Sequence, residues 1–151
     1  MSTCCSSKLK SNIAKKTNCI QCGESSHSVA FKTVLHHIVH PSNQNLREEI
    51  LYFCDSVICP VIYFSVDDII FTQESLRGPV GQKSNDPLRT ICYCFDVTAQ
   101  QVLDELCIDG LSPSKEFVVN QTKEKNCACE IRNPSGRCCL ANFPTKIEVV
   151  K

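Results

Sequence analysis

The sequence predicts an α+β protein in which a small β-rich lobe precedes a mostly helical lobe. Short runs of β-branched and aromatic residues fill the first half, whereas two helix-start signals lie in the second half. A stretch rich in Gly, Pro and polar residues, 77–89, separates the two halves. We therefore divide the chain into a thiol-containing tail (1–16), a β-rich lobe (17–78), a linker (79–88), a helical lobe (89–145) and a second tail (146–151).

Strands are expected in the first half because runs of β-branched and aromatic residues alternate there with turn residues. Pro41, Asn43, Pro60 and the Asp67-Asp68 pair interrupt these runs. The runs that we predict to be extended are 29–39, 50–53, 61–66 and 69–72.

Two helices are expected in the second half. Thr98 and Gln101 have the spacing of a capping box, and the helix that they begin is expected to end near Gly110. The apolar residues after the cap form one helical stripe: Val102, Leu103 and Leu106. Ser112, with Pro113 in the first turn, is expected to begin the second helix.

Composition restricts the class of partner and the compartment. The 16 Lys+Arg balance 16 Asp+Glu, so no nucleic-acid partner is expected from a basic face. The first 17 residues lack the apolar run of a signal peptide, and no stretch reaches the roughly eighteen apolar residues of a membrane span. We therefore expect a cytoplasmic protein without membrane insertion, whose 13 cysteines stay reduced unless a metal binds them.

The cysteines of the first half have the spacing of a zinc site. Cys19 and Cys22 are separated by two residues and followed by Gly23, which permits the positive φ of a tight metal-binding turn. Cys54 and Cys59 provide a second pair. Four thiolates of this kind can hold one tetrahedral zinc ion, which would help to stabilise a strand-rich unit of roughly 60 residues.

Two alternatives stay open for this region. Cys54 and Cys59 also fit the interpretation of small buried hydrophobic residues, since free cysteine is often buried. His27, near the first pair, is a weaker alternate ligand. The remaining histidines are interpreted as exposed strand and turn residues: His36, His37 and His40.

A second group of cysteines lies beyond the linker. Cys92 and Cys94 are one residue apart, a spacing that suits a metal cluster better than one small zinc ion. The turn-forming sequence Asn-Pro-Ser-Gly at 133–136 is expected to bring Cys138 and Cys139 back toward Cys129. Four such thiolates are the usual ligands of a [2Fe-2S] cluster.

These motifs resemble a known family. CxxC and FCxxxxC before the linker, with CYC and NPSGRCC after it, are similar to the amino-terminal domain of CopZ-type copper chaperones and to related stand-alone iron-sulfur metallochaperones. The resemblance implies a zinc-stabilised β-rich lobe and a mostly helical [2Fe-2S]-binding lobe. The cluster ligands that it implies are Cys92, Cys94, Cys129 and Cys139. The zinc ligands that it implies are Cys19, Cys22, Cys54 and Cys59.

The sequence departs from the family in two respects and also carries three cysteines outside both groups. Cys127 forms an extra CxC with Cys129, and Cys138 is adjacent to Cys139, so Cys127 and Cys138 are alternate cluster ligands. Cys107 is interpreted as a small buried residue. Cys4 and Cys5, near several lysines, form a possible soft-metal site for Cu(I). The GMTCxxC loop of full-length copper chaperones is absent from this sequence.

Three function classes fit these observations. The leading hypothesis is an iron-sulfur and zinc-binding metallochaperone of copper homeostasis, whose cluster supplies electrons that reduce Cu(II) to Cu(I). Its expected partners are metal ions and a copper transporter or redox partner protein. The second class is an electron-transfer or regulatory [2Fe-2S] module without metal cargo, and the third is a thiol oxidoreductase that uses Cys19 and Cys22. No hydrolytic motif is present and no catalytic residue is assigned.

Overall fold

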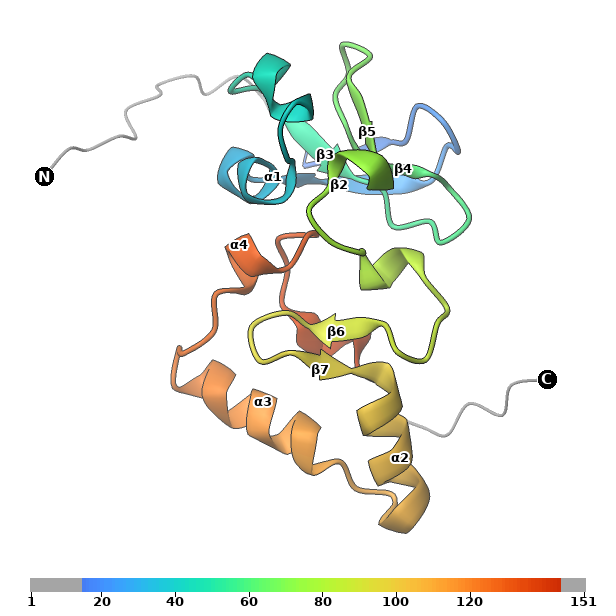
Figure 1. Ribbon diagram of the computed structural model, residues 1–151, viewed down its shortest axis with the longest axis vertical. Coiled ribbons are helices and arrows are strands. Elements are labelled where there is room, and N and C mark those ends of the chain that lie inside the picture. Colours follow the sequence, from blue (N-terminus) through green and yellow to red (C-terminus); the bar gives the residue numbers. More distant parts are fainter. Residues whose placement is uncertain (1–14, 145–151) are drawn as a thin grey trace, which may run out of the picture.

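The computed structural model describes residues 15–144, which form a sheet lobe and a helical lobe stacked along the long axis of the molecule (Figure 1). The sheet lobe contains one five-stranded antiparallel sheet, whose spatial order follows the chain. Its strands are β1 (Lys16–Asn18), β2 (Ser25–Val29), β3 (Leu51–Phe53), β4 (Val61–Phe64) and β5 (Ile70–Thr72).

The alternation of side chains along β3 separates the lobe's core from its cysteine site. Leu51 and Phe53 belong to the main core, which also contains Tyr63 from β4. Tyr52 points to the other face and packs with Phe64 in a smaller cluster that contains Cys19, Cys54 and Cys59. The sheet therefore has an apolar core on one face and the first cysteine group on the other.

One predicted strand is wrong. The segment expected to be extended over 29–39 contains helix α1 (Phe31–His37). Its buried residues are Thr33, Val34 and His37. The second and third lie one and four residues after the first, a spacing that matches a helix and not a strand. The β-branched residues that suggested a strand are tolerated because the buried face of α1 packs onto the core, and tertiary packing overrides weak propensity. A single-turn 3₁₀ helix, η1 (Ser42–Asn45), follows.

The helical lobe begins with a two-stranded sheet, β6 (Thr90–Cys92) and β7 (Val97–Thr98). Helices α2 (Ala99–Asp109) and α3 (Pro113–Lys123) follow and confirm both predicted helices. Thr98 and Gln101 form the expected capping box, and Ser112 caps α3. The lobe ends with the one-turn helix α4 (Cys129–Arg132) and the 3₁₀ turn η4 (Cys139–Asn142).

The segment between the lobes is packed, although its composition predicted a linker. Val80 is 2% exposed and belongs to the core of the sheet lobe. The backbone N–H of Gly81 donates to the Tyr93 hydroxyl of the helical lobe at 2.6 Å. Two 3₁₀ turns, η2 (Gln73–Ser75) and η3 (Gly81–Lys83), shape this connection. The lobes are thus joined through packed contacts as well as through the chain.

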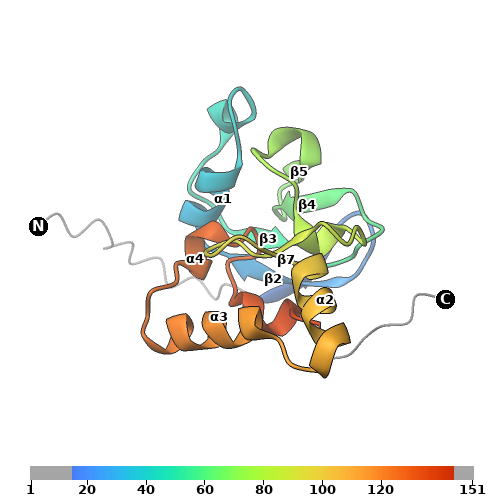
Figure 2. The ribbon, with the colours of Figure 1, turned by 60° about the horizontal axis from the view of Figure 1, so that its bottom comes forward.

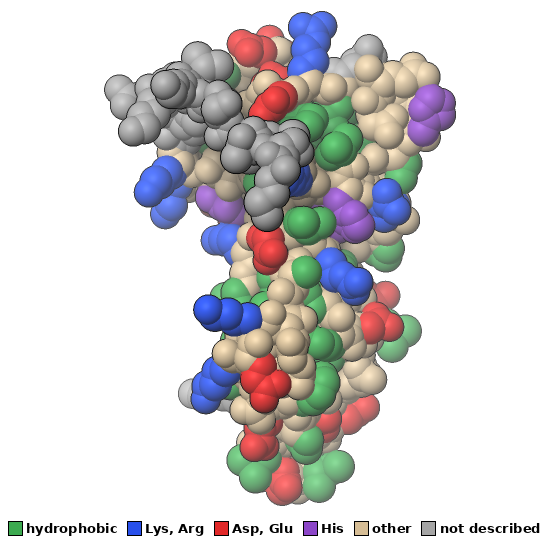
Figure 3. Space-filling model, turned by 90° about the vertical axis from the view of Figure 1, so that its left-hand side faces the viewer, with side chains coloured by type: hydrophobic (Ala, Val, Ile, Leu, Met, Phe, Trp, Pro, Cys, Tyr) green, Lys and Arg blue, Asp and Glu red, His purple; other side chains and the backbone are tan. Residues whose placement is uncertain are grey.

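The two lobes also meet through their helices. Helix α1 of the sheet lobe lies against α4 of the helical lobe, and both views place them side by side (Figures 1 and 2). Acidic and basic side chains are interspersed on the face drawn in Figure 3, in keeping with the balanced charge. Within residues 15–144, no helix is long and apolar enough to cross a membrane.

Candidate metal centres

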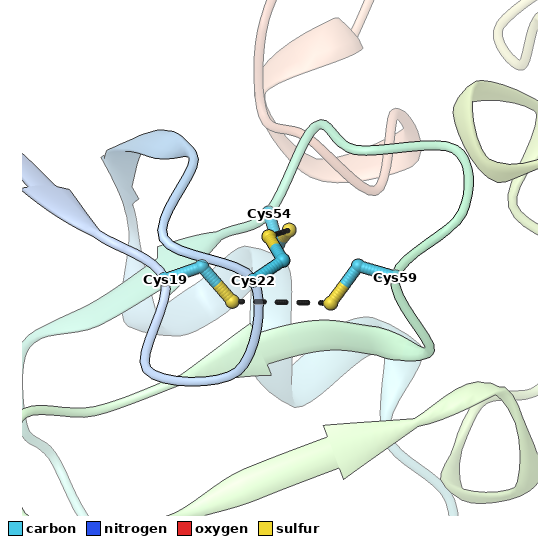
Figure 4. A group of neighbouring side chains, drawn as sticks. All are labelled: Cys19, Cys22, Cys54 and Cys59. Carbon is cyan, nitrogen blue, oxygen red and sulfur yellow. Dashed lines mark hydrogen bonds between the residues drawn. The ribbon is translucent and has the colours of Figure 1, made fainter.

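The first cysteine group converges at one point on the sheet lobe (Figure 4). The four sulfur atoms all lie within 4.8 Å of one another. Cys19 Sγ and Cys59 Sγ are 4.0 Å apart, and Cys22 Sγ and Cys54 Sγ are 3.6 Å apart. A tetrahedral zinc ion with Zn–S bonds of about 2.3 Å separates its sulfur ligands by about 3.8 Å. The donor chemistry and the spacing of this group therefore fit a structural zinc ion.

Tight turns place these four side chains. The first pair lies in the turn after β1, where the Cys19 N–H donates to the Glu24 carbonyl at 2.8 Å and the Gly23 N–H donates to the Cys19 carbonyl at 2.9 Å. Gly23 has a φ of +79°, the positive value expected for this turn. Cys54 follows β3 and Cys59 precedes β4, so two neighbouring strands hold the second pair at fixed positions.

Sequence reasoning missed a side chain that holds this second pair. Lys83 Nζ donates to the carbonyls of Ser56 at 2.7 Å and Cys59 at 3.3 Å. Its charge also acts to lower the pKa of Cys54. No local signal in the sequence points to Lys83, because its partners lie 24 and 27 residues earlier in the chain.

Burial controls the ionisation of the thiols when no cation is present. Burial raises the pKa of Cys54 to about 12 and also raises that of Cys59. Burial acts in the same direction on Cys22, but the Glu24 backbone and the Cys54 thiol donate hydrogen bonds that lower its pKa overall. Cys54 and Cys59 therefore ionise more readily when a positive charge is bound, as zinc coordination requires.

The structure distinguishes the alternatives left open for this region. Cys54 and Cys59 are buried, as the hydrophobic interpretation expects, but their sulfur atoms also point toward those of Cys19 and Cys22. His27 points elsewhere: its Nδ1 lies 3.5 Å from an Asp55 carboxylate oxygen. The prediction that His37 is exposed is wrong, because it is 6% exposed on the inner face of α1.

The second cysteine group lies in the core of the helical lobe. Cys94 Sγ and Cys129 Sγ are 3.6 Å apart. Cys139 interacts with both Cys92 and Cys129, and these interactions raise its pKa. Cys92, Cys129 and Cys139 are buried and Cys94 is half-buried. These residues come from β6, the β6–β7 turn, α4 and η4, so elements far apart in sequence bring them together.

This group fits the donor set of a [2Fe-2S] cluster. Such a cluster takes four cysteine ligands, two for each iron, and four cysteines lie in or against this one core. The hydrogen bond from Cys139 lowers the pKa of Cys92 to about 6, and the same bond raises the pKa of Cys139. Burial raises the pKa of Cys129 to about 12. One ionised thiol, Cys92, is thus already favoured, whereas Cys129 and Cys139 ionise more readily when a positive charge is bound.

The remaining cysteines are less well placed as ligands. Cys127 is half-buried at the edge of the same core, and Cys138 is exposed. Cys107, predicted to be buried, is exposed near the end of α2 because the stripe toward the core uses Val102 and Leu106 instead. Cys4 and Cys5 lie outside the described residues. Within residues 15–144, every cysteine is free of disulfide bonds.

Comparisons with known proteins agree with this architecture. A family described as a zinc binding domain, of the CopZ type, matches residues 16–77. The copper chaperone CopZ of Archaeoglobus fulgidus is 36% identical over 89 residues. That alignment covers 58% of this chain and 41% of the relative, so the match spans less than half of the relative's length.

A solved structure extends the similarity to both lobes. The X-ray structure of the A. fulgidus CopZ N-terminal domain superposes with a TM-score of 0.69 at 28% identity. The superposition covers 85% of this chain and 99% of that domain. The similarity therefore includes the helical lobe with its second cysteine group, which lies outside the matched zinc-binding segment.

Proposed function

Residues 16–77 belong to the CopZ zinc-binding domain family, and from this premise we propose that the chain is a metallochaperone-like protein of copper homeostasis. In this proposal the sheet lobe holds one zinc ion and the helical lobe holds one [2Fe-2S] cluster. The observation that carries it is the second cysteine group: four thiols lie in or against one core that a small domain would otherwise fill with apolar residues.

The zinc ion has a structural role in this proposal. Its ligands are Cys19, Cys22, Cys54 and Cys59, which together leave no open coordination position for a substrate. A zinc ion bound by both Cys19 and Cys22 would also exclude a thiol oxidoreductase, in which these two thiols must be free to react with each other.

The cluster is proposed to sit on Cys92, Cys94, Cys129 and Cys139, with Cys127 and Cys138 as alternates. A [2Fe-2S] centre accepts and donates one electron at a time. Three of the four ligands are buried, so the protein shields that side from water, whereas half-buried Cys94 marks the side nearest to solvent. This exposure suits electron transfer to a small ion or a docked partner.

The proposed reaction is the one-electron reduction of Cu(II) to Cu(I). One electron leaves the reduced cluster for each copper ion, and a cellular one-electron donor restores it. Soft thiolates prefer Cu(I), so exposed Cys138 is a candidate to hold the product near the cluster. A copper transporter is the proposed recipient, and the cytoplasm is the proposed compartment.

Metal analysis of anaerobically purified protein tests the two sites together. We expect one zinc, two irons and two sulfides per chain, with the visible absorption of a [2Fe-2S] centre. Cys92→Ala is expected to lose iron and sulfide but keep zinc, whereas Cys107→Ala, at an exposed cysteine, is expected to keep both. Zinc alone in wild-type protein, even after reconstitution with iron and sulfide, would contradict the cluster.

Copper reduction needs a separate measurement, because thiols also reduce Cu(II) while forming disulfides. Chemically reduced, desalted protein is mixed with Cu(II) and a Cu(I)-specific chromogenic chelator under anaerobic conditions. We expect a fast phase of one Cu(I) per cluster in wild-type and Cys107→Ala protein, and none in Cys92→Ala. A cluster-containing protein without this phase would favour the second class, an electron-transfer or regulatory module.

A further inference from the structure

The loop that joins two proposed cluster ligands, residues 129–139, is held by the other lobe. Four of its backbone carbonyls each accept a hydrogen bond from a side chain of the sheet lobe. These bonds run from Thr33 Oγ1 to Glu130 O, from His37 Nε2 to Ile131 O (2.9 Å), from Tyr63 Oη to Pro134 O and from His27 Nε2 to Ser135 O (3.1 Å). We name this set of contacts the carbonyl clasp.

The carbonyl clasp replaces bonds that the loop cannot make within itself. Helix α4 has a single turn, so the carbonyls of Glu130 and Ile131 have no partner further along a helix. Thr33 and His37 lie on the buried face of α1 and supply the missing donors. Helices α1 and α4 are therefore bonded through side chains of one and backbone of the other.

The turn after α4 is buried in the same contact. Asn133 is fully buried, and its Oδ1 accepts hydrogen bonds from the Ser135 N–H at 3.0 Å and from Gln82 Nε2 at 2.8 Å. The Tyr63 hydroxyl reaches the Pro134 carbonyl from the core of the sheet lobe. A turn that exposes its backbone to water in most proteins is here inserted between two lobes.

An ion pair connects the ligand-bearing loops directly. Arg137, two residues before Cys139, donates from one guanidinium nitrogen to both carboxylate oxygens of Asp55, at 2.9 and 3.0 Å. Asp55 is the residue after Cys54, and His27 lies on its other side at 3.5 Å. One residue of the zinc loop thus contacts one residue of the cluster loop and one residue of the carbonyl clasp.

From these contacts we propose that the sheet lobe, folded around its Cys4 site, holds loop 129–139 in the conformation that binds the cluster, so that zinc binding and cluster retention are coupled. The inference rests on the proposed function and adds regulation to it. Binding at one site that orders a structure shared with the other must raise affinity at both. Loss of zinc would then release the cluster, and loss of the cluster would weaken zinc.

The physical basis is the marginal stability of the sheet lobe. A unit of roughly 60 residues buries too little surface to be strongly stable without help, and a structural zinc ion contributes directly to its folding. Without zinc, the strands that carry His27 and Tyr63 and the helix that carries Thr33 lose their fixed positions. The four clasped carbonyls would then return to water, and the Cys129–Cys139 spacing would no longer be set.

Conservative variants that remove single donors test the inference. Tyr63→Phe and Thr33→Val keep the shape of each side chain and delete its hydroxyl. Thr72→Val, at a half-buried position on β5 outside the carbonyl clasp, is the matched control. Each protein is loaded with both metals, checked for zinc content and far-UV circular dichroism, and challenged with an iron chelator while visible absorption is followed.

We expect Tyr63→Phe and Thr33→Val to lose the cluster about tenfold faster than wild type, and Thr72→Val to match wild type. Zinc release is then measured with a chromogenic zinc indicator in proteins with and without Cys92→Ala. Cys92→Ala is expected to speed zinc release in an otherwise wild-type chain and to have little effect when Tyr63→Phe is already present. This loss of coupling distinguishes the inference from general destabilisation, which would leave the effect of Cys92→Ala unchanged.

The outcomes separate the two proposals. A wild-type protein that binds zinc but no cluster would contradict the proposed function and the inference with it. If wild-type protein binds a cluster but loses it as fast as Tyr63→Phe and Thr33→Val do, the inference alone is overturned. Zinc release at the same rate in wild type and in Cys92→Ala would overturn it as well. This last measurement does not depend on the folding of any carbonyl clasp variant.

Discussion

His37 shows how one residue can differ from its expected role. The sequence places it beside His36 in a segment that resembles an exposed strand, yet it is buried on α1 with Nε2 donating to the Ile131 carbonyl. In the neutral ring, that bond places the proton on Nε2. Burial lowers the pKa of His37 to about 4, and the nearby charges of His36 and Arg77 act in the same direction.

The low pKa of His37 predicts an acid-sensitive fold. As pH falls below about 6.5, the usual pKa of histidine, the unfolded chain takes up the proton before the folded chain does. The free energy of unfolding should therefore decrease between about pH 6.5 and pH 4, by about 3 kcal/mol in total for this group. Above pH 6.5 its contribution is fully present.

Urea unfolding at a series of pH values checks this prediction. Other groups also titrate in this range, and acid releases metals from thiols, so the comparison is between wild type and His37→Gln. Glutamine keeps an N–H donor but cannot be protonated. The difference in unfolding free energy between the two proteins should change with pH in the stated window; a difference that is constant from pH 7 to pH 4 would refute the prediction.

The cap of α2 provides a prediction at the scale of an element. The Thr98 hydroxyl accepts a hydrogen bond from the Gln101 N–H, and the Gln101 side chain accepts one from the Thr98 N–H at 2.9 Å. Thr98→Ala should lower the free energy of unfolding by about 1 kcal/mol, whereas Thr98→Ser should keep most of it. Thermal unfolding of both variants measures the effect, and equal losses would rule out the capping bond as its cause.

Elements with local signals could be predicted, and α1 could not. Helices α2 and α3 are encoded by caps within a few residues, and β3, β4 and β5 by apolar runs between turns. α1 has no side-chain cap and no acidic residue in its first turn. Only its burial pattern identifies it as a helix, and that pattern depends on the core against which it packs.

At the scale of the molecule, spacing in the sequence indicated which cysteines could gather but not how they pair. The short intervals of CxxC, CxxxxC and CxC follow directly from the chain. Cys94 pairs with Cys129 across 35 residues, and the carbonyl clasp spans 71 to 108 residues. Contacts of this range depend on how the lobes dock, for which no local pattern exists.

The docking of the two lobes depends on a close approach between Gly81, in the segment between the lobes, and the backbone of Thr90 in the helical lobe. A Cβ atom there would lie 2.0 Å from the backbone oxygen of Thr90, at the start of β6, and 3.3 Å from the Tyr93 hydroxyl. Because a backbone atom cannot move aside as a flexible side chain can, any larger residue must push the segment away from the helical lobe. Gly78, three residues earlier, has no atom within 4 Å of the corresponding position.

We therefore expect Gly81→Ala to destabilise the protein and Gly78→Ala to be nearly neutral. Forcing an extra methyl group into a packed contact costs about 1–3 kcal/mol, and here it also disturbs the Gly81–Tyr93 hydrogen bond. Urea unfolding of the two variants measures the difference, and both glycine-to-alanine changes reduce the freedom of the unfolded chain alike. If Gly81→Ala were as stable as Gly78→Ala, the lobes would not meet at Gly81, and the fixed docking that holds loop 129–139 would lose a principal support.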